Sequence, residues 1–176
     1  MNSMNKRKNK SIYYVIAFVI VSLLTILDQF TKYLVIRYLK GQNPVVLIEN
    51  VLEFKYLENR GMAFGLFSGK IPVFVITCVI FLVLATCFFI KIPKNKFYFP
   101  IIIIEFVLTA GALGNFIDRV WRGYVVDFIY FKLIDFPVFN IADIYVVVSC
   151  ILLVLLIIFK YEDDDFKFVS LKRKER

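Results

Sequence analysis

The 176-residue sequence contains no histidine and only three cysteines. The absence of histidine excludes Ser-His-Asp and Cys-His catalysis and the histidine ligand sets that are common in zinc hydrolases. Cys78, Cys87 and Cys150 all lie within apolar runs, and no C-x-x-C pair occurs. An odd number of cysteines without such a pair argues against a disulfide framework or a metal knuckle. We therefore expect no metal, no cofactor and no catalytic thiol in this protein.

Polar residues are also scarce, since 60% of the chain is hydrophobic. A soluble domain is only about 45–50% apolar even when glycine is counted. The excess is gathered into four runs that are long enough, or nearly so, to cross a bilayer core of about 20 helical residues. These runs comprise residues 12–36, 71–90, 97–117 and 139–159. The sequence thus predicts one membrane-embedded domain over residues 1–176, an all-α membrane protein with four transmembrane helices.

The net charge of +8 could suggest a nucleic-acid partner, but the positions of the basic residues favour another interpretation. Lysines and arginines cluster next to the apolar runs, in residues 1–11, 91–96 and 160–176. Such clusters are typical of the cytoplasmic ends of membrane spans. No zinc-finger spacing, RNA-binding aromatic motif or phosphate-binding glycine loop accompanies them. We expect both termini in the cytoplasm, contacts with lipid headgroups, no nucleic acid and no obligatory protein partner.

The two connections predicted on the outer side comprise residues 37–70 and 118–138. In the first connection, residues 45–48 and 51–56 are rich in β-branched, aromatic and alternating apolar side chains, which indicates strands. Residues 124–131 in the second connection have a similar composition. The sequence therefore predicts a small extracytoplasmic β-rich cradle beside a second extracytoplasmic loop.

Polar residues of unusual position gather at the outer ends of the predicted spans. They are Asp28, Asn59, Arg60, Asn115, Asp118, Arg119, Asp127, Asn140 and Asp143. This convergence follows from hydropathy and charge alone, and it predicts a site near the outer face of the membrane.

Two of these residues, Asp127 and Asp143, form a candidate carboxylate pair. Asp127 interrupts an apolar run, which fits either an exposed interfacial group or a functional carboxylate with a raised pKa. Asp143 lies just inside the fourth span, where it fits either a functional group or a charge that favours the helix N-terminus. Without histidine or a metal set, the remaining hydrolytic route is a pair of carboxylates that share one proton.

The other polar residues have ordinary alternatives. Asn115 and Arg119 share one helix face, which fits helix packing and interfacial anchoring as well as a site. Asp28 and Lys32 are four residues apart, and a plain intrahelical ion pair explains them. Glu105 lies deep in the third run, so we expect a protonated or hydrogen-bonded side chain that faces the bundle and has a structural role.

Five stretches of the sequence resemble motifs of the lipoprotein signal peptidase (signal peptidase II) family of bacterial membrane aspartic proteases. They occur in the order and spacing of the family and extend over most of the chain. The stretches are Asp28-Gln29-x-x-Lys32, Asn59-x-Gly61-x-Ala63-Phe64, Gly111-Ala112-Leu113-Gly114-Asn115-x-x-Asp118-Arg119, Val126-Asp127-Phe128 and Phe139-Asn140-x-Ala142-Asp143.

The resemblance implies a function and a set of site residues. Asp127 and Asp143 would be the catalytic dyad of an endopeptidase in the bacterial cytoplasmic membrane, and the active site would lie near the outer face. The substrate would be a prolipoprotein, cut just before a diacylglyceryl-modified cysteine. The residues expected to support the dyad or bind the substrate are Asn59, Gly61, Asn115, Arg119, Asn140, Asp28 and Lys32.

The main alternative is a small transporter or proton-conducting membrane protein. Such proteins usually contain internal repeats and ionisable groups near the midplane of the membrane. In this sequence only Glu105 lies deep in a predicted span, and no repeat is visible. A purely structural membrane protein is a third possibility, but it leaves the clustered Asp and Asn residues unexplained.

Overall fold

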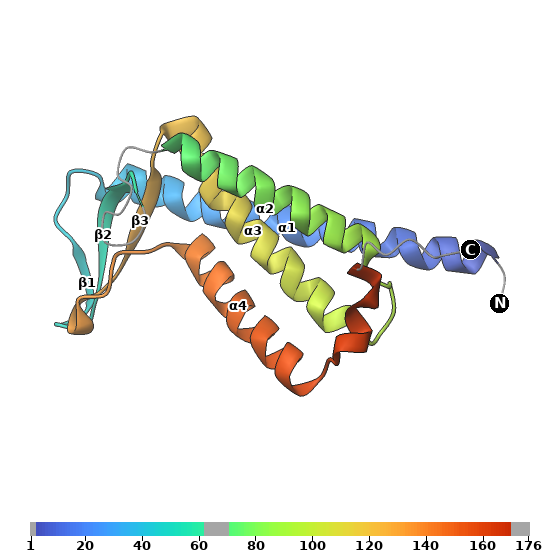
Figure 1. Ribbon diagram of the computed structural model, residues 1–176. Helices are drawn as coiled ribbons and strands as arrows, with labels where there is room; N and C mark the ends of the chain where they lie inside the picture. The colour runs from blue at the N-terminus through green and yellow to red at the C-terminus, as the bar shows by residue number, and fades with distance from the viewer. Residues whose placement is uncertain (1–2, 62–70, 170–176) are drawn as a thin grey trace.

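The computed structural model describes residues 3–61 and 71–169 and contains four long helices (Figure 1). All four are long and apolar enough to cross a membrane, by length and composition. The predicted four-helix membrane architecture with a small sheet is therefore confirmed. The helices are α1 (Ser3–Leu39), α2 (Ile71–Lys91), α3 (Phe99–Arg122) and α4 (Ile141–Phe159).

The helix boundaries differ from the predicted spans at the start of α1, which begins at Ser3 instead of residue 12, and at the end of α3. The prediction ended this span at residue 117, because a charged pair follows, whereas α3 continues to Arg122. The helix continues because Asp118 is fully buried and paired with Lys32 of α1, so its charge does not face lipid. Gly123 then ends the helix in the left-handed conformation, with φ of 74°, which glycine adopts without steric cost.

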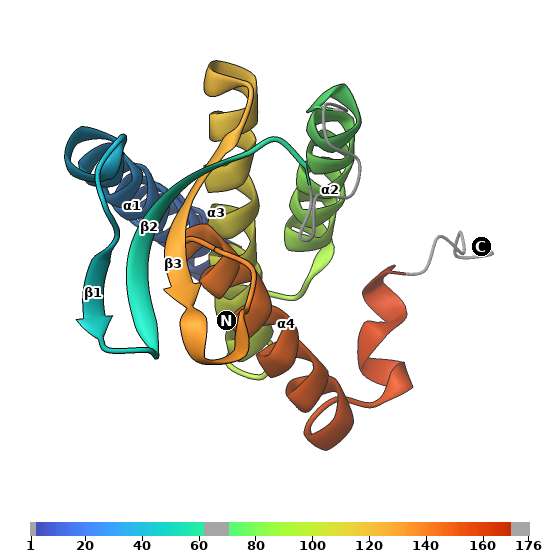
Figure 2. The same cartoon turned by 90° about the vertical axis from the view of Figure 1, so that its left-hand side faces the viewer.

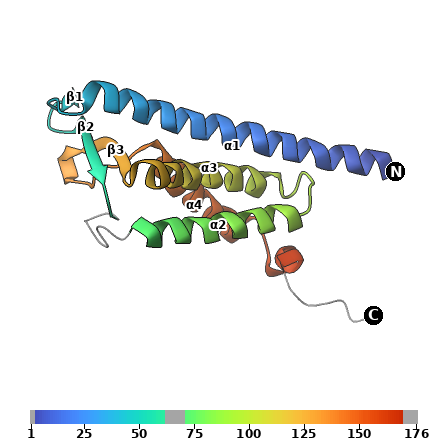
Figure 3. The ribbon, with the colours of Figure 1, turned by 90° about the horizontal axis from the view of Figure 1, so that it is seen from above.

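Helix α3 is the central helix, and it packs against α1, α2 and α4 (Figures 2 and 3). Two glycines let its neighbours come close. A Cβ atom on Gly111 would lie 2.6 Å from the carbonyl oxygen of Ala142 in α4. A Cβ atom on Gly114 would lie 2.5 Å from Oδ2 of Asp28 in α1. These contacts hold the polar ends of α1, α3 and α4 together.

The β-rich cradle is an antiparallel sheet in the order β1-β2-β3. Its strands are β1 (Val45–Ile48), β2 (Leu52–Asn59) and β3 (Val125–Phe131), close to the predicted segments. Strand β2 therefore connects the segment that follows α1 with the segment that follows α3, because it pairs with β1 on one side and with β3 on the other. Asp127 lies opposite Leu57 in this register, and Asn59 lies opposite Val125.

The sheet lies at one end of the helix bundle (Figure 1). The start of α1, the connection between α2 and α3, and the short helix η3 (Asp163–Val169) lie at the other end. Val126 and Phe128 of β3 pack against Val35 and Leu39 of α1 and so fix the sheet to the bundle. Many apolar side chains of α2 and α4 remain exposed, as expected for helices that contact lipid.

Candidate active site

Asp127 is carried by β3 and is almost completely buried, with a relative exposure of 1%. Both of its carboxylate oxygens accept hydrogen bonds from side-chain amides. Asn59 Nδ2 donates to Oδ2 at 2.8 Å, and Asn140 Nδ2 donates to Oδ1 at 2.6 Å. Asn59 is in turn held by the backbone N–H of Gly61, which donates to its Oδ1 at 3.0 Å. Gly61, which was expected to support the dyad or bind the substrate, thus orients Asn59 through its backbone.

Asp143 lies in the first turn of α4, where it forms a capping box with Asn140. The backbone N–H of Asp143 donates to Asn140 Oδ1 at 3.0 Å, and the backbone N–H of Asn140 donates to Asp143 Oδ2 at 3.0 Å. Asn115 Nδ2 of α3 donates to the other oxygen, Oδ1, at 2.7 Å. The cap explains why α4 begins at Ile141, and it fixes the direction of the Asp143 side chain.

Asn140 links the two carboxylates, because its backbone bonds to Asp143 while its side chain bonds to Asp127. All four carboxylate oxygens therefore accept an N–H group. Burial, followed by the nearby charge of Asp143, raises the pKa of Asp127 to about 7. The amides of Asn59 and Asn140 oppose this effect and favour the ionised form. This pair of acids can share one proton near neutral pH.

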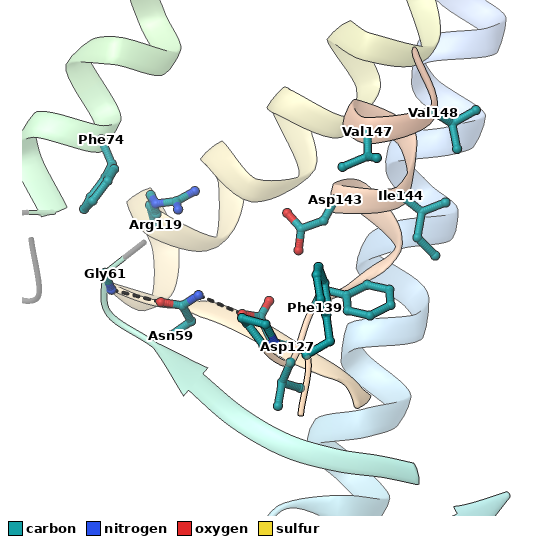
Figure 4. A pocket seen from close by; sticks show the side chains of 13 residues that line it. Asn59, Gly61, Phe74, Arg119, Asp127, Phe139, Asp143, Ile144, Val147 and Val148 are labelled. Carbon is teal, nitrogen blue, oxygen red and sulfur yellow. Dashed lines mark hydrogen bonds between the residues drawn. The ribbon is translucent and has the colours of Figure 1, made fainter. Parts of the chain in front are cut away.

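The two carboxylates line a cavity of ≈ 540 Å³ (Figure 4). In the close-up, Asp143 on α4 and Asp127 on β3 face the same space, with Arg119 and Phe74 on its far side. Apart from the polar groups at one end, the lining is apolar and aromatic, with Phe136, Pro137, Val138, Phe139, Ile144, Val147 and Val148. The cavity can accept an extended apolar ligand beside a polar reaction centre.

A second polar cluster lies behind the carboxylate pair. Lys32 and Asp28 are both completely buried, and Lys32 Nζ lies 2.9 Å from Asp28 Oδ2 and 3.1 Å from Asp118 Oδ2. Lys32 also donates to Asn115 Oδ1 at 3.0 Å. The simple intrahelical ion pair predicted from the sequence is therefore incomplete, because Lys32 connects α1 to α3 and reaches the amide that holds Asp143.

Gln29 and Arg122 of this cluster were not predicted as site residues, and Asp118 was placed among the convergent polar residues but was given no role. Gln29 Nε2 donates to Asp118 Oδ1 at 3.2 Å and to the Gly114 carbonyl at 3.1 Å. Arg122 pairs with Asp118 and donates to Gln29 Oε1 at 3.1 Å. The Asp118–Arg122 spacing of four residues was the available signal, but the predicted helix end at residue 117 concealed it.

Arg119 lies in the cavity wall, and its contacts are with Asn115 and Phe74. Its NH1 donates to the carbonyl oxygen of Asn115 at 3.3 Å, and its guanidinium lies 5.0 Å from the ring centroid of Phe74. Among the described residues, no hydrogen bond or ion pair joins Arg119 to Asp127 or Asp143. Its side chain faces the cavity, so a role toward a ligand fits it better than a role in holding the pair.

Residues 62–70 lie outside the described residues, and so do Ala63 and Phe64 of the quoted motif. The cysteines are all free, and Cys78 lies closest to the site, with its Sγ 3.7 Å from the Ala112 carbonyl oxygen. The part of the chain that the structure describes contains no group of three or more Cys, Asp and Glu side chains that could hold a metal ion.

The sequence matches the family model described as signal peptidase (SPase) II over residues 20–159. The chain belongs to the signal peptidase II family.

Curated relatives and solved structures agree with this assignment. A lipoprotein signal peptidase from Caldanaerobacter subterraneus subsp. tengcongensis is 43% identical over 145 residues, which cover 82% of this chain and 97% of the relative. One from Staphylococcus aureus strain MRSA252 is 40% identical over 132 residues, covering 74% and 80% of the two chains.

A solved structure described as a bacterial membrane enzyme at 1.9 Å resolution has a TM-score of 0.72 and 37% identity. The match covers 82% of this chain and 94% of that one. This signal peptidase II is thus a multi-pass membrane peptidase of the aspartic type that removes signal peptides from prolipoproteins, and the transporter alternative is not favoured.

Proposed function

We propose that Asp127 and Asp143 are the catalytic dyad of this signal peptidase II and that it cuts just before a diacylglyceryl-modified cysteine. The observation that carries the proposal is the linkage of these two acids through Asn140 at the polar end of an otherwise apolar cavity. The raised pKa of Asp127 supports it, because a dyad must hold one proton at working pH.

The dyad works by acid–base catalysis. The ionised carboxylate takes a proton from water, and the water oxygen attacks the carbonyl carbon of the residue before the modified cysteine. The protonated carboxyl donates a hydrogen bond to the carbonyl oxygen as negative charge develops there. The pair then protonates the leaving amine of the cysteine, the peptide bond breaks, and the dyad returns to a state with one shared proton.

The surrounding residues hold the dyad and receive the substrate. Asn59, Asn140 and Asn115 orient the carboxylates, while Lys32 and Asp28 act one step further away through Asn115. Arg119 and Gly61 line the cavity and are available to the substrate backbone or to the polar part of its lipid. The apolar walls suit an acylated peptide that enters from the bilayer.

The direct test is cleavage of a lipid-modified prolipoprotein by the purified enzyme. We expect a decrease in size that corresponds to loss of the signal peptide, with the lipidated cysteine as the new N-terminus. A matched substrate in which serine replaces the cysteine carries no lipid and should not be cut. Equal cleavage of both substrates would remove the lipid-specific part of the proposal.

The proposed orientation places both termini in the cytoplasm and the active site near the outer face. A cysteine introduced at Gln42, beside the sheet, should therefore react with an impermeant thiol reagent in intact cells. One introduced at Asn95, in the connection between α2 and α3, should react only after the cells are opened. Both tests use a background in which Cys78, Cys87 and Cys150 are replaced. The reverse labelling pattern would contradict the orientation and the outer site.

The raised pKa of Asp127 predicts the alkaline limit of activity. Asp127 is protonated below about pH 7 and ionises above it, so kcat/KM should fall as pH rises through about 7 and the shared proton is lost. The stability of the folded protein should change with pH in the same direction as kcat/KM. Since the pKa of Asp127 in the folded protein lies above its ordinary value of 3.8, the stabilisation is fully present below that value and is lost as pH rises through about 7.

Asn59→Ala and Glu58→Gln provide matched variants for this pH profile. Asn59 favours the ionised form of Asp127, so its replacement should move the alkaline limb to higher pH. The hydrogen bond from Lys40 and those from Tyr56 and Arg60 lower the pKa of Glu58 to about 2. Glu58 therefore stays ionised across an assay range of about pH 5 to pH 9, which brackets neutral pH. If the wild-type, Asn59→Ala and Glu58→Gln enzymes all lost activity at the same alkaline pH, Asp127 would not be the source of this limb.

A further inference from the structure

An apolar groove between α2 and α4 leads away from the dyad along the face of α3. The dyad cavity shares Phe74, Arg119 and Asp143 with a neighbouring cavity of ≈ 360 Å³. That cavity shares Phe81 and Leu108 with a third one, of ≈ 390 Å³. The three cavities are therefore neighbours in a row that runs from the dyad toward the end of the bundle where α3 begins.

Glu105 is the one acidic side chain among the described residues that line the third cavity. Thr109 Oγ1 donates to its Oε1 at 3.2 Å. Its other oxygen, Oε2, is buried and has no hydrogen-bond partner in the part of the chain that the structure describes. All other residues that line this cavity are apolar. A carboxylate oxygen without a donor in such surroundings is unfavourable, and a cationic ligand in the groove would satisfy it.

The distance from the dyad to Glu105 matches the dimensions of a signal peptide. Asn115, which holds Asp143, and Glu105 are ten residues apart on α3, which corresponds to about 15 Å of helix. A signal peptide has a basic leader, then an apolar segment of roughly 7–15 residues, then the cleavage site. As a helix this segment is about 10–22 Å long. A lysine or arginine at its start therefore reaches Glu105 when the scissile bond is at the dyad.

We infer that Glu105 is a specificity-determining residue that binds the cationic group of the signal peptide leader while the apolar segment lies in the groove. The inference rests on the proposed function of the dyad and adds a second contact point on the substrate. The long basic side chain follows the apolar wall and brings its charged end to the Glu105 carboxylate. Glu105 binds the substrate at a distance from the reacting bond, so it affects KM and leaves kcat unchanged.

The test uses two lipidated prolipoproteins that differ only by lysine or glutamine at the start of the apolar segment. Wild-type enzyme should show a KM about tenfold lower for the lysine substrate, as expected for a hydrogen bond to a charged group. Glu105→Gln should bring the two KM values together with kcat unchanged. Asp163→Asn is the control, because Asp163 is an exposed acid at the start of η3, which lies at the end of the bundle where α3 begins, and this variant should keep the tenfold preference. A preserved preference in folded Glu105→Gln would overturn the inference.

A series of substrates for the wild-type enzyme provides a test that does not depend on folding of the variant. A single lysine is moved along the leader while the cleavage site stays fixed. KM should be lowest when the lysine lies about ten residues before the scissile bond and should rise as it moves more than two helical turns away. A KM that does not depend on this position would overturn the inference while leaving the dyad intact. If wild-type enzyme cut no member of the series, the proposed function itself would be wrong.

Discussion

Asp127→Asn and Asp143→Asn enzymes are each expected to lose cleavage by about 10²–10⁴-fold or more, because each change removes one half of the only acid–base pair proposed for the reaction. An asparagine side chain keeps the size and can still accept one of the two N–H groups at each position, so both proteins should still fold and insert. The measurement is kcat/KM on a lipidated prolipoprotein, beside thermal unfolding of the same purified samples.

Asp135→Asn is the matched control for these two variants. Asp135 also lies at the sheet end of the molecule, is exposed, and accepts a hydrogen bond from Tyr130 Oη at 2.6 Å. Its φ of 49° is tolerated by asparagine, so the change should leave both folding and cleavage intact. A folded Asp127→Asn or Asp143→Asn enzyme with nearly wild-type turnover would show that the dyad is wrongly assigned.

Lys32→Met should cause the largest loss of stability among single substitutions near the site. The change leaves Asp28 and Asp118, both completely buried, without their shared cation, and breaking a buried pair typically costs about 3–5 kcal/mol. It also removes the donor to Asn115 Oδ1. We expect a lower folded yield and a much lower midpoint in thermal unfolding of the purified protein.

Two further variants show whether the buried charge is responsible. Lys40→Met removes an ion pair with Glu58 that is largely exposed, and it should leave the unfolding midpoint nearly unchanged. The double variant Asp28→Asn/Lys32→Met removes one buried charge of each sign and should regain part of the stability lost in Lys32→Met. If Lys32→Met unfolded at the wild-type temperature, the buried cluster would not stabilise the fold in the way described.

Hydropathy and strand periodicity predicted the four helices and the three strands, because these signals depend only on local sequence. The end of α3 was predicted too early for a physical reason. Hydropathy counts Asp118 as a charge that must leave the membrane, whereas the folded chain neutralises it with Lys32, a residue 86 positions away in sequence. Pairing between distant helices is invisible to any window along the chain.

The same limit applies to the candidate site. Clustering at one end of the spans selected Asp127 and Asp143 as a candidate pair, but it could not assign partners to the surrounding residues. Arg119 was expected to support the pair or bind the substrate, and its contact with the ring of Phe74 could not be predicted. Gln29 was seen as part of a motif but not as the side chain that connects Gly114 and Asp118. Side-chain direction depends on the rotation of each helix about its axis, which packing against neighbours determines.

An amide N–H donates a hydrogen bond to each oxygen of Asp127 and Asp143, and this restricts where the proton that the two acids share can lie. A carboxylate oxygen has two lone pairs, and an amide N–H that points at one of them prevents a proton from occupying that position. Asn59, Asn115 and Asn140 each block such positions, and the backbone N–H of Asn140 blocks one more. The proton can then reside only on the lone pairs that remain, and neither carboxyl group can rotate without breaking a hydrogen bond. The asparagines thus act as a template that determines the direction in which the acid delivers its proton.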